Sequence, residues 1–211
     1  MTGVVAAAFV PMTPLVFRHL AGRADPAAEL RDASVAAVRE ACDGAEQVVV
    51  LCPVGGREAP GDWHDPSRAR PVHGAPEALS TQVGRHLLEL AAIGLPASFV
   101  ECTDGVAAAA PAGPRTALVV LGDGAAARSQ GAPGHIDERS FPFDDALAAA
   151  LQAGDGAALT AYDEEVAAAL MVTGRHSWPA AAKLLPHASR AVLRHRSDPF
   201  GLTYVVALWR A

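Results

Sequence analysis

A carboxylate stands at a position of the chain where ligands commonly bind. The valine-rich run at residues 116–121 is followed directly by Gly122, Asp123 and Gly124. In an open α/β sheet, ligands bind at the carboxyl ends of the strands because several strand-to-helix loops converge there. We therefore predict Asp123 as a catalytic acid or base and the two glycines as substrate contacts. The alternative is a tight turn in which Asp123 only caps the loop.

The loop that follows carries further groups that could do chemistry. It holds the guanidinium of Arg128 and the imidazole of His135, with the charged residues Asp137 and Arg139 beside them. An imidazole and a carboxylate can share acid–base work, so we predict His135 as catalytic together with Asp123. Arg128 can bind a carboxylate or phosphate through two parallel hydrogen bonds, and we predict it as a substrate contact. A purely structural role for His135 is the alternative.

Four other side chains are predicted to line the same crevice as substrate contacts. Met12 and Cys52 follow the first and second apolar runs, and Arg175 and His176 stand together in a later loop. The Cys52 thiol could act as a nucleophile only beside a cation or histidine that lowers its pKa. The alternatives are an inert buried thiol and a structural role for His176.

The sequence carries no recognisable metal or nucleotide motif. His64 and His73 share the long loop at residues 53–76 with acidic residues, but this spacing has no fixed geometry, so we predict no metal site. The chain has no glycine-rich motif that opens a helix for a dinucleotide or a phosphate. It also lacks the Gly-x-Ser-x-Gly elbow that carries a nucleophilic serine.

The elements that must position these residues alternate between strands and helices. Short valine-rich runs predict buried strands, and apolar residues three to four positions apart predict amphipathic helices. Strands are predicted at residues 4–10, 47–52, 97–100, 116–121, 191–195 and 203–209. Helices are predicted at residues 26–42, 79–91, 143–153, 163–172 and 179–185. This order predicts one α/β domain over residues 1–211, with a central, mostly parallel sheet flanked by helices and an antiparallel C-terminal edge.

The composition argues against several classes of partner. Hydrophobic residues make up 51% of the chain and the formal net charge is −6, with no basic stripe, so we expect no nucleic-acid partner. Cys42, Cys52 and Cys102 lack the spacing of a zinc site or a disulfide framework, which suits free thiols in a reducing compartment. No apolar run reaches the ~18–20 residues of a membrane span. The apolar N-terminal run lacks the basic residues of a signal peptide, so we expect a cytoplasmic protein with no membrane partner.

Several short segments resemble, in their order along the chain, those of one known family. They are residues 10–14, 122–124, 132–139, 143–144, 154–155, 174–178 and 198–204. Together they resemble the catalytic (B) subunit of class III extradiol ring-cleavage dioxygenases. More closely, they resemble the short, alanine-rich bacterial proteins that are similar to that subunit. The resemblance extends over nearly the whole chain.

The resemblance also implies where an iron site would lie. The family holds a ferrous ion with two histidines and a glutamate, which leaves open positions for substrate and dioxygen. Met12 stands where the first histidine is expected, and residues 52–56 replace the segment with the second. Arg128 takes the place of the catalytic histidine, and residues 174–178 contain no glutamate. Because a thioether and a guanidinium cannot replace imidazole on iron, the resemblance implies a degenerate site with no metal and no cofactor.

We therefore predict a divergent member of this family that binds a small organic molecule in the former active-site crevice. The ligand would be anionic if Arg128 contacts it. The alternatives are a metal-dependent oxygenase that keeps Fe²⁺ through a rebuilt site and a metal-free acid–base enzyme. A further alternative is a non-catalytic scaffold that forms a homo-oligomer.

Overall fold

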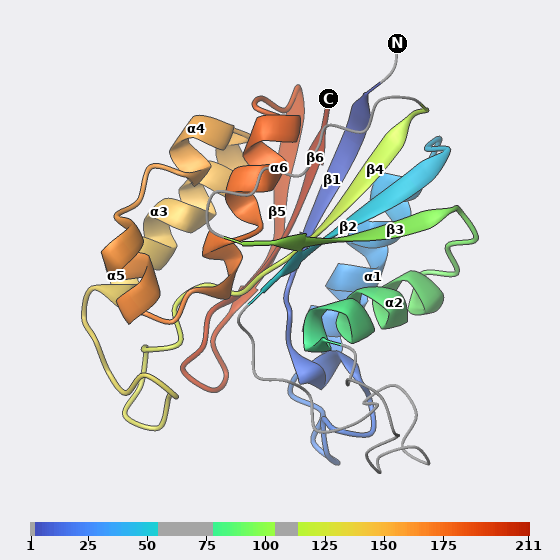
Figure 1. Ribbon diagram of the computed structural model, residues 1–211. Coiled ribbons are helices and arrows are strands. Elements are labelled where there is room, and N and C mark those ends of the chain that lie inside the picture. Colours follow the sequence, from blue (N-terminus) through green and yellow to red (C-terminus); the bar gives the residue numbers. More distant parts are fainter. Residues whose placement is uncertain (1–2, 55–77, 104–113) are drawn as a thin grey trace.

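A single twisted sheet of six strands organises the chain. The computed structural model describes residues 3–54, 78–103 and 114–211. The strands are β1 (Val4–Val10), β2 (Gln47–Pro53), β3 (Ala97–Cys102), β4 (Thr116–Leu121), β5 (Arg190–Ser197) and β6 (Tyr204–Arg210). Their spatial order is β3-β2-β4-β1-β6-β5 (Figure 1). The first four strands pair in parallel, and β6 and β5 add an antiparallel edge, which confirms the predicted fold class.

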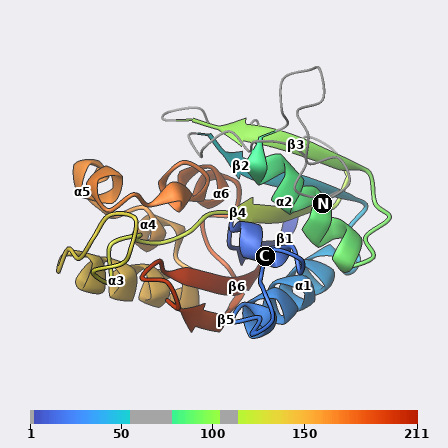
Figure 2. The same ribbon diagram turned by 90° about the horizontal axis from the view of Figure 1, so that it is seen from below.

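Helices cover both faces of this sheet. They are α1 (Ala28–Cys42), α2 (Leu79–Leu90), α3 (Ser140–Ala153), α4 (Gly156–Leu159), α5 (Glu164–Ala169) and α6 (Trp178–Leu184), with two 3-10 turns, η1 (Pro14–Val16) and η3 (Thr173–Arg175). The helices α1 and α2 pack on one face and α3 to α6 on the other (Figures 1 and 2). Each face has its own hydrophobic core.

The first helix begins later than its sequence predicts. A helix that began at residue 26, as predicted, would have Asp25 as its capping residue. In the structure the backbone of Asp25 has a φ of +41°, and its carboxylate pairs with Arg31 at 2.5 Å. The helix starts at Ala28, and no side chain caps it. The carboxylate of Asp25 therefore pairs with Arg31 instead of accepting a hydrogen bond from the first turn of the helix.

Strand β4 decides which way the predicted site residues point. Its residues are fully buried, and they alternate between the core under α1 and α2 and the core under α3 to α6. This alternation continues past the end of the strand. Gly122 faces Gly174 and Ser177 on the second side, and Asp123 turns to Met12 on the first.

The neighbouring strands β1 and β4 also send the chain to opposite faces. The chain leaves β1 toward α1 on one face and leaves β4 toward α3 on the other. Where adjacent parallel strands diverge in this way, a crevice forms outside their carboxyl ends and commonly receives a ligand. Asp123 and Met12 lie at this point of divergence.

Candidate functional site

A buried carboxyl group lies at the point where β1 and β4 diverge. Asp123 is only 4% exposed, and its Oδ1 accepts a hydrogen bond of 3.0 Å from the backbone N–H of Met12. Burial raises the pKa of this carboxyl to about 7, and the hydrogen bond from Met12 opposes the rise. A carboxyl that titrates near neutrality can act as either acid or base.

Two hydroxyl groups complete this site. The Thr13 hydroxyl donates to the Tyr204 hydroxyl over 3.4 Å, and both residues are buried. Tyr204 opens β6, which lies antiparallel beside β1, so it reaches the carboxyl end of β1. Burial and the nearby Asp123 carboxylate raise the pKa of Tyr204 to about 12, which keeps it a phenol. We call Met12, Thr13, Asp123 and Tyr204 the carboxyl-end cluster.

The backbone of Asp123 is held from the opposite side. Its N–H donates to the Thr173 hydroxyl at 2.8 Å, and its carbonyl accepts from the N–H of Gly174 at 3.2 Å. The Ser177 hydroxyl donates to the carbonyl of Leu121 at 2.5 Å. These contacts fix the end of β4 and so fix the direction of the Asp123 carboxyl.

The two predicted glycine contacts have a packing reason. A Cβ atom on Gly122 would lie 2.5 Å from the Cα of Gly174, and one on Gly124 would lie 2.7 Å from Oδ1 of Asp144. Neither glycine is among the residues with positive φ. Close approach of neighbouring segments therefore accounts for both glycines.

Cys52 lies on the same side of the sheet as the carboxyl-end cluster. Its thiol is fully buried, and burial raises its pKa to about 12. The thiol donates to the carbonyl of Val50 over 3.8 Å, and the nearby side chains of Thr81 and Ser80, at the start of α2, oppose the rise in pKa. A neutral buried thiol is a poor nucleophile, so these surroundings favour the inert role.

Arg128 is tied to carboxylates of the protein itself. Its Nη1 lies 3.2 Å from Oδ2 of Asp144, and its Nε lies 2.6 Å from Oδ2 of Asp198. Asp144 is completely buried and also accepts from the Ala125 N–H at 3.0 Å and from the Thr203 hydroxyl at 2.6 Å. These contacts favour a structural role for Arg128 over the predicted ligand contact.

The carboxyl-end cluster does not include the predicted residues Arg175, His135 and His176, although Arg175 belongs to η3, the turn that binds the backbone of Asp123. Arg175 donates to the carbonyl of Val172 at 2.7 Å and pairs with Glu164 at 3.3 Å. His135 is exposed, and its Nδ1 lies 3.4 Å from the carbonyl oxygen of Gln130. His176 is half-buried after η3. In the described ranges no hydrogen bond or ion pair joins His135 to Asp123, so the structure does not assemble the predicted acid–base pair.

Sequence reasoning missed three residues of this region, namely Thr13, Thr173 and Tyr204. Thr13 and Tyr204 lie within the segments at residues 10–14 and 198–204 that carried the family resemblance. That position was the available signal for both. Thr173 lies just outside the segment at residues 174–178, and nothing in the sequence marked it.

The residues present do not fit the iron site of the family. The positions expected for the iron ligands hold the thioether of Met12, residues 52–56 without a histidine, and residues 174–178 without a glutamate, and Arg128 stands where the catalytic histidine is expected. A thioether and a guanidinium do not belong to the ligand set of two histidines and one carboxylate that holds non-haem ferrous iron. The described residues contain no group of three or more histidines, cysteines or carboxylates that could hold a metal. His64 and His73, with most of the long loop, lie outside the described residues.

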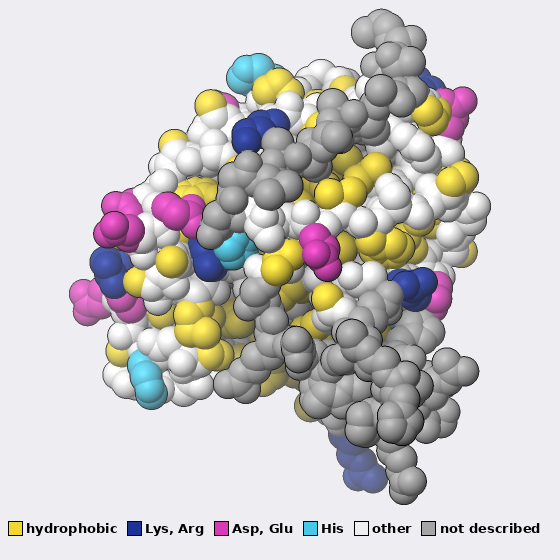
Figure 3. Space-filling view, viewed as in Figure 1, with side chains coloured by type: hydrophobic (Ala, Val, Ile, Leu, Met, Phe, Trp, Pro, Cys, Tyr) yellow, Lys and Arg dark blue, Asp and Glu magenta, His cyan; other side chains and the backbone are white. Residues whose placement is uncertain are grey.

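Comparison with known proteins leaves the family open. No family model matches the sequence, and no curated protein matches it. No helix in the described part of the chain is long and apolar enough to cross a membrane. On the face seen in Figure 3, the basic side chains are dispersed among acidic ones.

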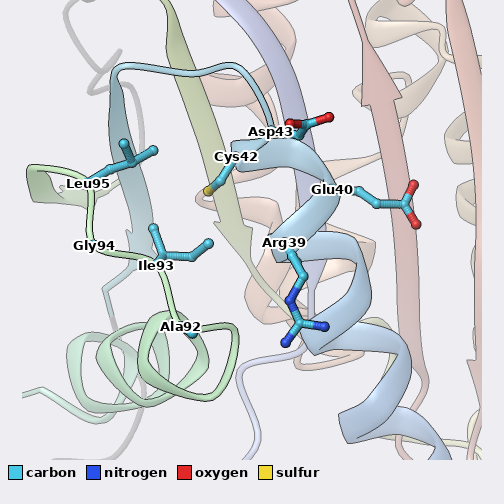
Figure 4. A pocket seen from close by; sticks show the side chains of 8 residues that line it. All are labelled: Arg39, Glu40, Cys42, Asp43, Ala92, Ile93, Gly94 and Leu95. Atoms are coloured by element: carbon cyan, nitrogen blue, oxygen red, sulfur yellow. The ribbon is translucent and has the colours of Figure 1, made fainter.

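Two cavities in the described part lie away from the carboxyl-end cluster. One, of about 420 Å³, lies between the C-terminal end of α1 and the segment that joins α2 to β3 (Figure 4). It is lined by Cys42, Ile93 and Leu95, and Arg39 extends from α1 toward Ala92. The other, of about 400 Å³, lies between α3 and α5. Neither is lined by a predicted site residue.

Proposed function

We propose that this protein binds a small organic molecule at the carboxyl end of its sheet, beside Asp123. One observation carries this proposal. A carboxyl group is buried at the point where β1 and β4 diverge, and the structure holds it there by its backbone and by the Met12 N–H. Burying a carboxyl group is unfavourable, and carboxyl groups buried in this way, with a strongly shifted pKa, are found preferentially at functional sites. The family hypothesis is a divergent, iron-free relative of the extradiol dioxygenases.

The surroundings favour an uncharged ligand over an anionic one. The sequence pointed to an anion because of Arg128, but that guanidinium and the one of Arg175 are each paired with carboxylates. The carboxyl-end cluster offers hydroxyl groups, one N–H already in use and a carboxyl that accepts hydrogen bonds. A ligand with its own hydroxyl or N–H donor fits these groups best.

Acid–base catalysis is a second candidate, favoured by the pKa of Asp123 near 7. A group with this pKa exchanges protons readily at neutral pH. The hydroxyl of Tyr204, whose pKa the Asp123 carboxylate helps to raise, would be the second group in place of the exposed His135. Proton exchange into a bound phenol or enol would be the type of step to look for.

Saturation-transfer NMR with phenol, catechol and benzoate tests the binding proposal. We expect phenol and catechol to bind and benzoate to bind much more weakly. Replacing Asp123 by asparagine (Asp123→Asn) should weaken binding of catechol about tenfold, because it removes a charge-assisted acceptor. The control is Asp32→Asn, a change at an exposed aspartate of α1. Equal binding of benzoate, or the same affinity in both variants, would contradict the proposal.

A further inference from the structure

A second cavity lies on the face of the sheet opposite to the carboxyl-end cluster. It has a volume of about 400 Å³ and opens between α3 on one side and α4 and α5 on the other. Its interior is apolar and is formed by Phe143, Leu147, Leu159, Tyr162 and Val166. These residues belong to, or pack against, the core under α3 to α6. The cavity is thus built into the rigid part of the fold.

Aromatic and small side chains together give the cavity its shape. The rings of Phe143 and Tyr162 have centroids 5.7 Å apart and an interplanar angle of 55°. Three alanines, Ala146, Ala158 and Ala161, complete the lining, and each fills only the volume of a methyl group. Ligand pockets commonly measure ~300–1,000 Å³, so this one suits a molecule of one or two rings. The two rings pack against each other at a tilted angle, so a flat ligand ring would lie against this aromatic pair and not between its members.

The rim of the cavity carries the guanidinium of Arg139 and the carboxylate of Asp163. Arg139 is held by Asp137, with 2.6 Å between Nη2 and Oδ2 and 3.0 Å between Nε and Oδ1. Asp163, also on the rim, accepts the N–H of Val166 at 3.0 Å. Because Asp137, outside the lining, already pairs with Arg139, and Asp163 adds a negative charge at the rim, an anion is disfavoured. The guanidinium has five N–H donors and Asp137 occupies the Nε and Nη2 side, so donors on Nη1 remain for a neutral acceptor.

From these features we propose that the cavity between α3 and α5 is a second binding site, for a small uncharged aromatic molecule that carries one hydrogen-bond acceptor. The ring lies against Phe143 and Tyr162, and the acceptor meets Arg139. This explains why Arg139 and Asp137, prominent in the sequence, take no part in the carboxyl-end cluster. The site is independent of the function proposed above.

Titration of the ¹⁵N-labelled protein with benzamide, toluene and benzoate tests this site. Benzamide has a ring and a neutral acceptor, toluene has only the ring, and benzoate has the ring and a charge. We expect benzamide to bind most tightly and to shift the amide signals of Phe143, Ala146 and Tyr162. Benzoate should bind most weakly.

Two matched variants locate the binding. Ala146 and Ala149 are both exposed on α3, but only Ala146 lines the cavity. Ala146→Trp should fill the cavity and weaken benzamide binding at least about tenfold, whereas Ala149→Trp should leave it unchanged. Arg139→Gln should remove most of the preference for benzamide over toluene. Asp123→Asn should have no effect, which separates this site from the carboxyl-end cluster.

Three results would overturn the proposal. The first is equal binding of benzamide by the two tryptophan variants, and the second is tighter binding of benzoate than of benzamide. The third comes from sedimentation velocity. If the protein is a dimer that Ala146→Trp alone converts to a monomer, a second copy of the chain covers the cavity and no small molecule is its occupant.

Discussion

At the scale of single residues, burial decides the chemistry of the titratable groups. Asp123 is buried with one hydrogen bond from Met12, and its carboxyl therefore titrates near neutral pH. Asp144 is buried with two donors, the Ala125 N–H and the Thr203 hydroxyl, and the guanidinium of Arg128, and burial still raises its pKa. The first group can exchange a proton with a ligand. The second is enclosed by its own partners and serves the fold.

Asp123 should make the stability of the protein depend on pH. Its pKa is about 7 in the folded chain and near 3.8 when unfolded, so the folded state holds the proton more tightly. The stabilisation is fully present below about pH 4 and is lost as the pH rises through 7, a difference of up to about 4 kcal/mol. Urea denaturation of the wild type and of Asp123→Asn from pH 4 to pH 8 measures it. The difference in the free energy of unfolding between the wild type and Asp123→Asn should change steadily with pH. If this difference is the same at every pH, Asp123 is ionised throughout the range.

Replacement of Arg128 should lower the stability of the fold and not only weaken the binding of a ligand. If Arg128 were only the predicted substrate contact, Arg128→Ala would abolish binding with little change in melting temperature. The structure changes that expectation, because the substitution leaves the completely buried Asp144 without its cation. We expect a loss of about 3 kcal/mol in the free energy of unfolding. The control, Arg23→Ala at an exposed arginine, should lose less than about 0.5 kcal/mol. Equal stability of the two variants would return Arg128 to the list of ligand contacts.

At the scale of elements, the end of β4 is the point on which the site depends. It is clamped between η3, which binds Asp123 and packs on Gly122, and the start of β6, which supplies Tyr204. Gly174 makes room in turn for Trp178, since a Cβ on Gly174 would lie 2.0 Å from the indole ring. The two turns therefore fit together only because both carry glycine.

Gly122→Ala tests this clamp. The new methyl group would lie 2.5 Å from backbone atoms of Gly174, which cannot move as a flexible side chain could. We expect a loss of about 1–3 kcal/mol in the free energy of unfolding, measured by chemical denaturation. Gly131→Ala is the control, because no atom lies within 4 Å of the added carbon and the backbone has no positive φ. If Gly122→Ala and Gly131→Ala lower the free energy of unfolding equally, the close packing of Gly122 against Gly174 does not stabilise the end of β4.

At the scale of the whole molecule, one sheet separates two cores and two cavities of ligand size. The connections from β1 and β4 leave for opposite faces, and the carboxyl-end cluster lies between these two central strands of the sheet. The charged antiparallel strand β5 closes one edge of the sheet, where Arg194 and Arg196 pair with Glu40 and Asp145 from helices on opposite faces. The edge strand thus ties both helical layers to the sheet.

The sequence by itself determined the local elements and the class of the fold. Runs such as residues 48–51 and 117–121 are apolar throughout, and their shortness and valine content favour strands buried on both faces. The same reasoning placed Asp123 at the carboxyl end of a strand. These conclusions depend on residues close together in the chain.

Only the tertiary structure decided which side chains meet. Asp123 binds the N–H of Met12 across 111 residues, and Arg128 pairs with Asp198 across 70. Neither pairing leaves a local pattern, because each depends on the order of strands in the sheet and on which face a side chain takes. For that reason the sequence could name Asp123, Arg128 and His135 as candidates. The folded chain then placed Asp123 in the cluster with Tyr204, tied Arg128 to carboxylates and left His135 on the surface.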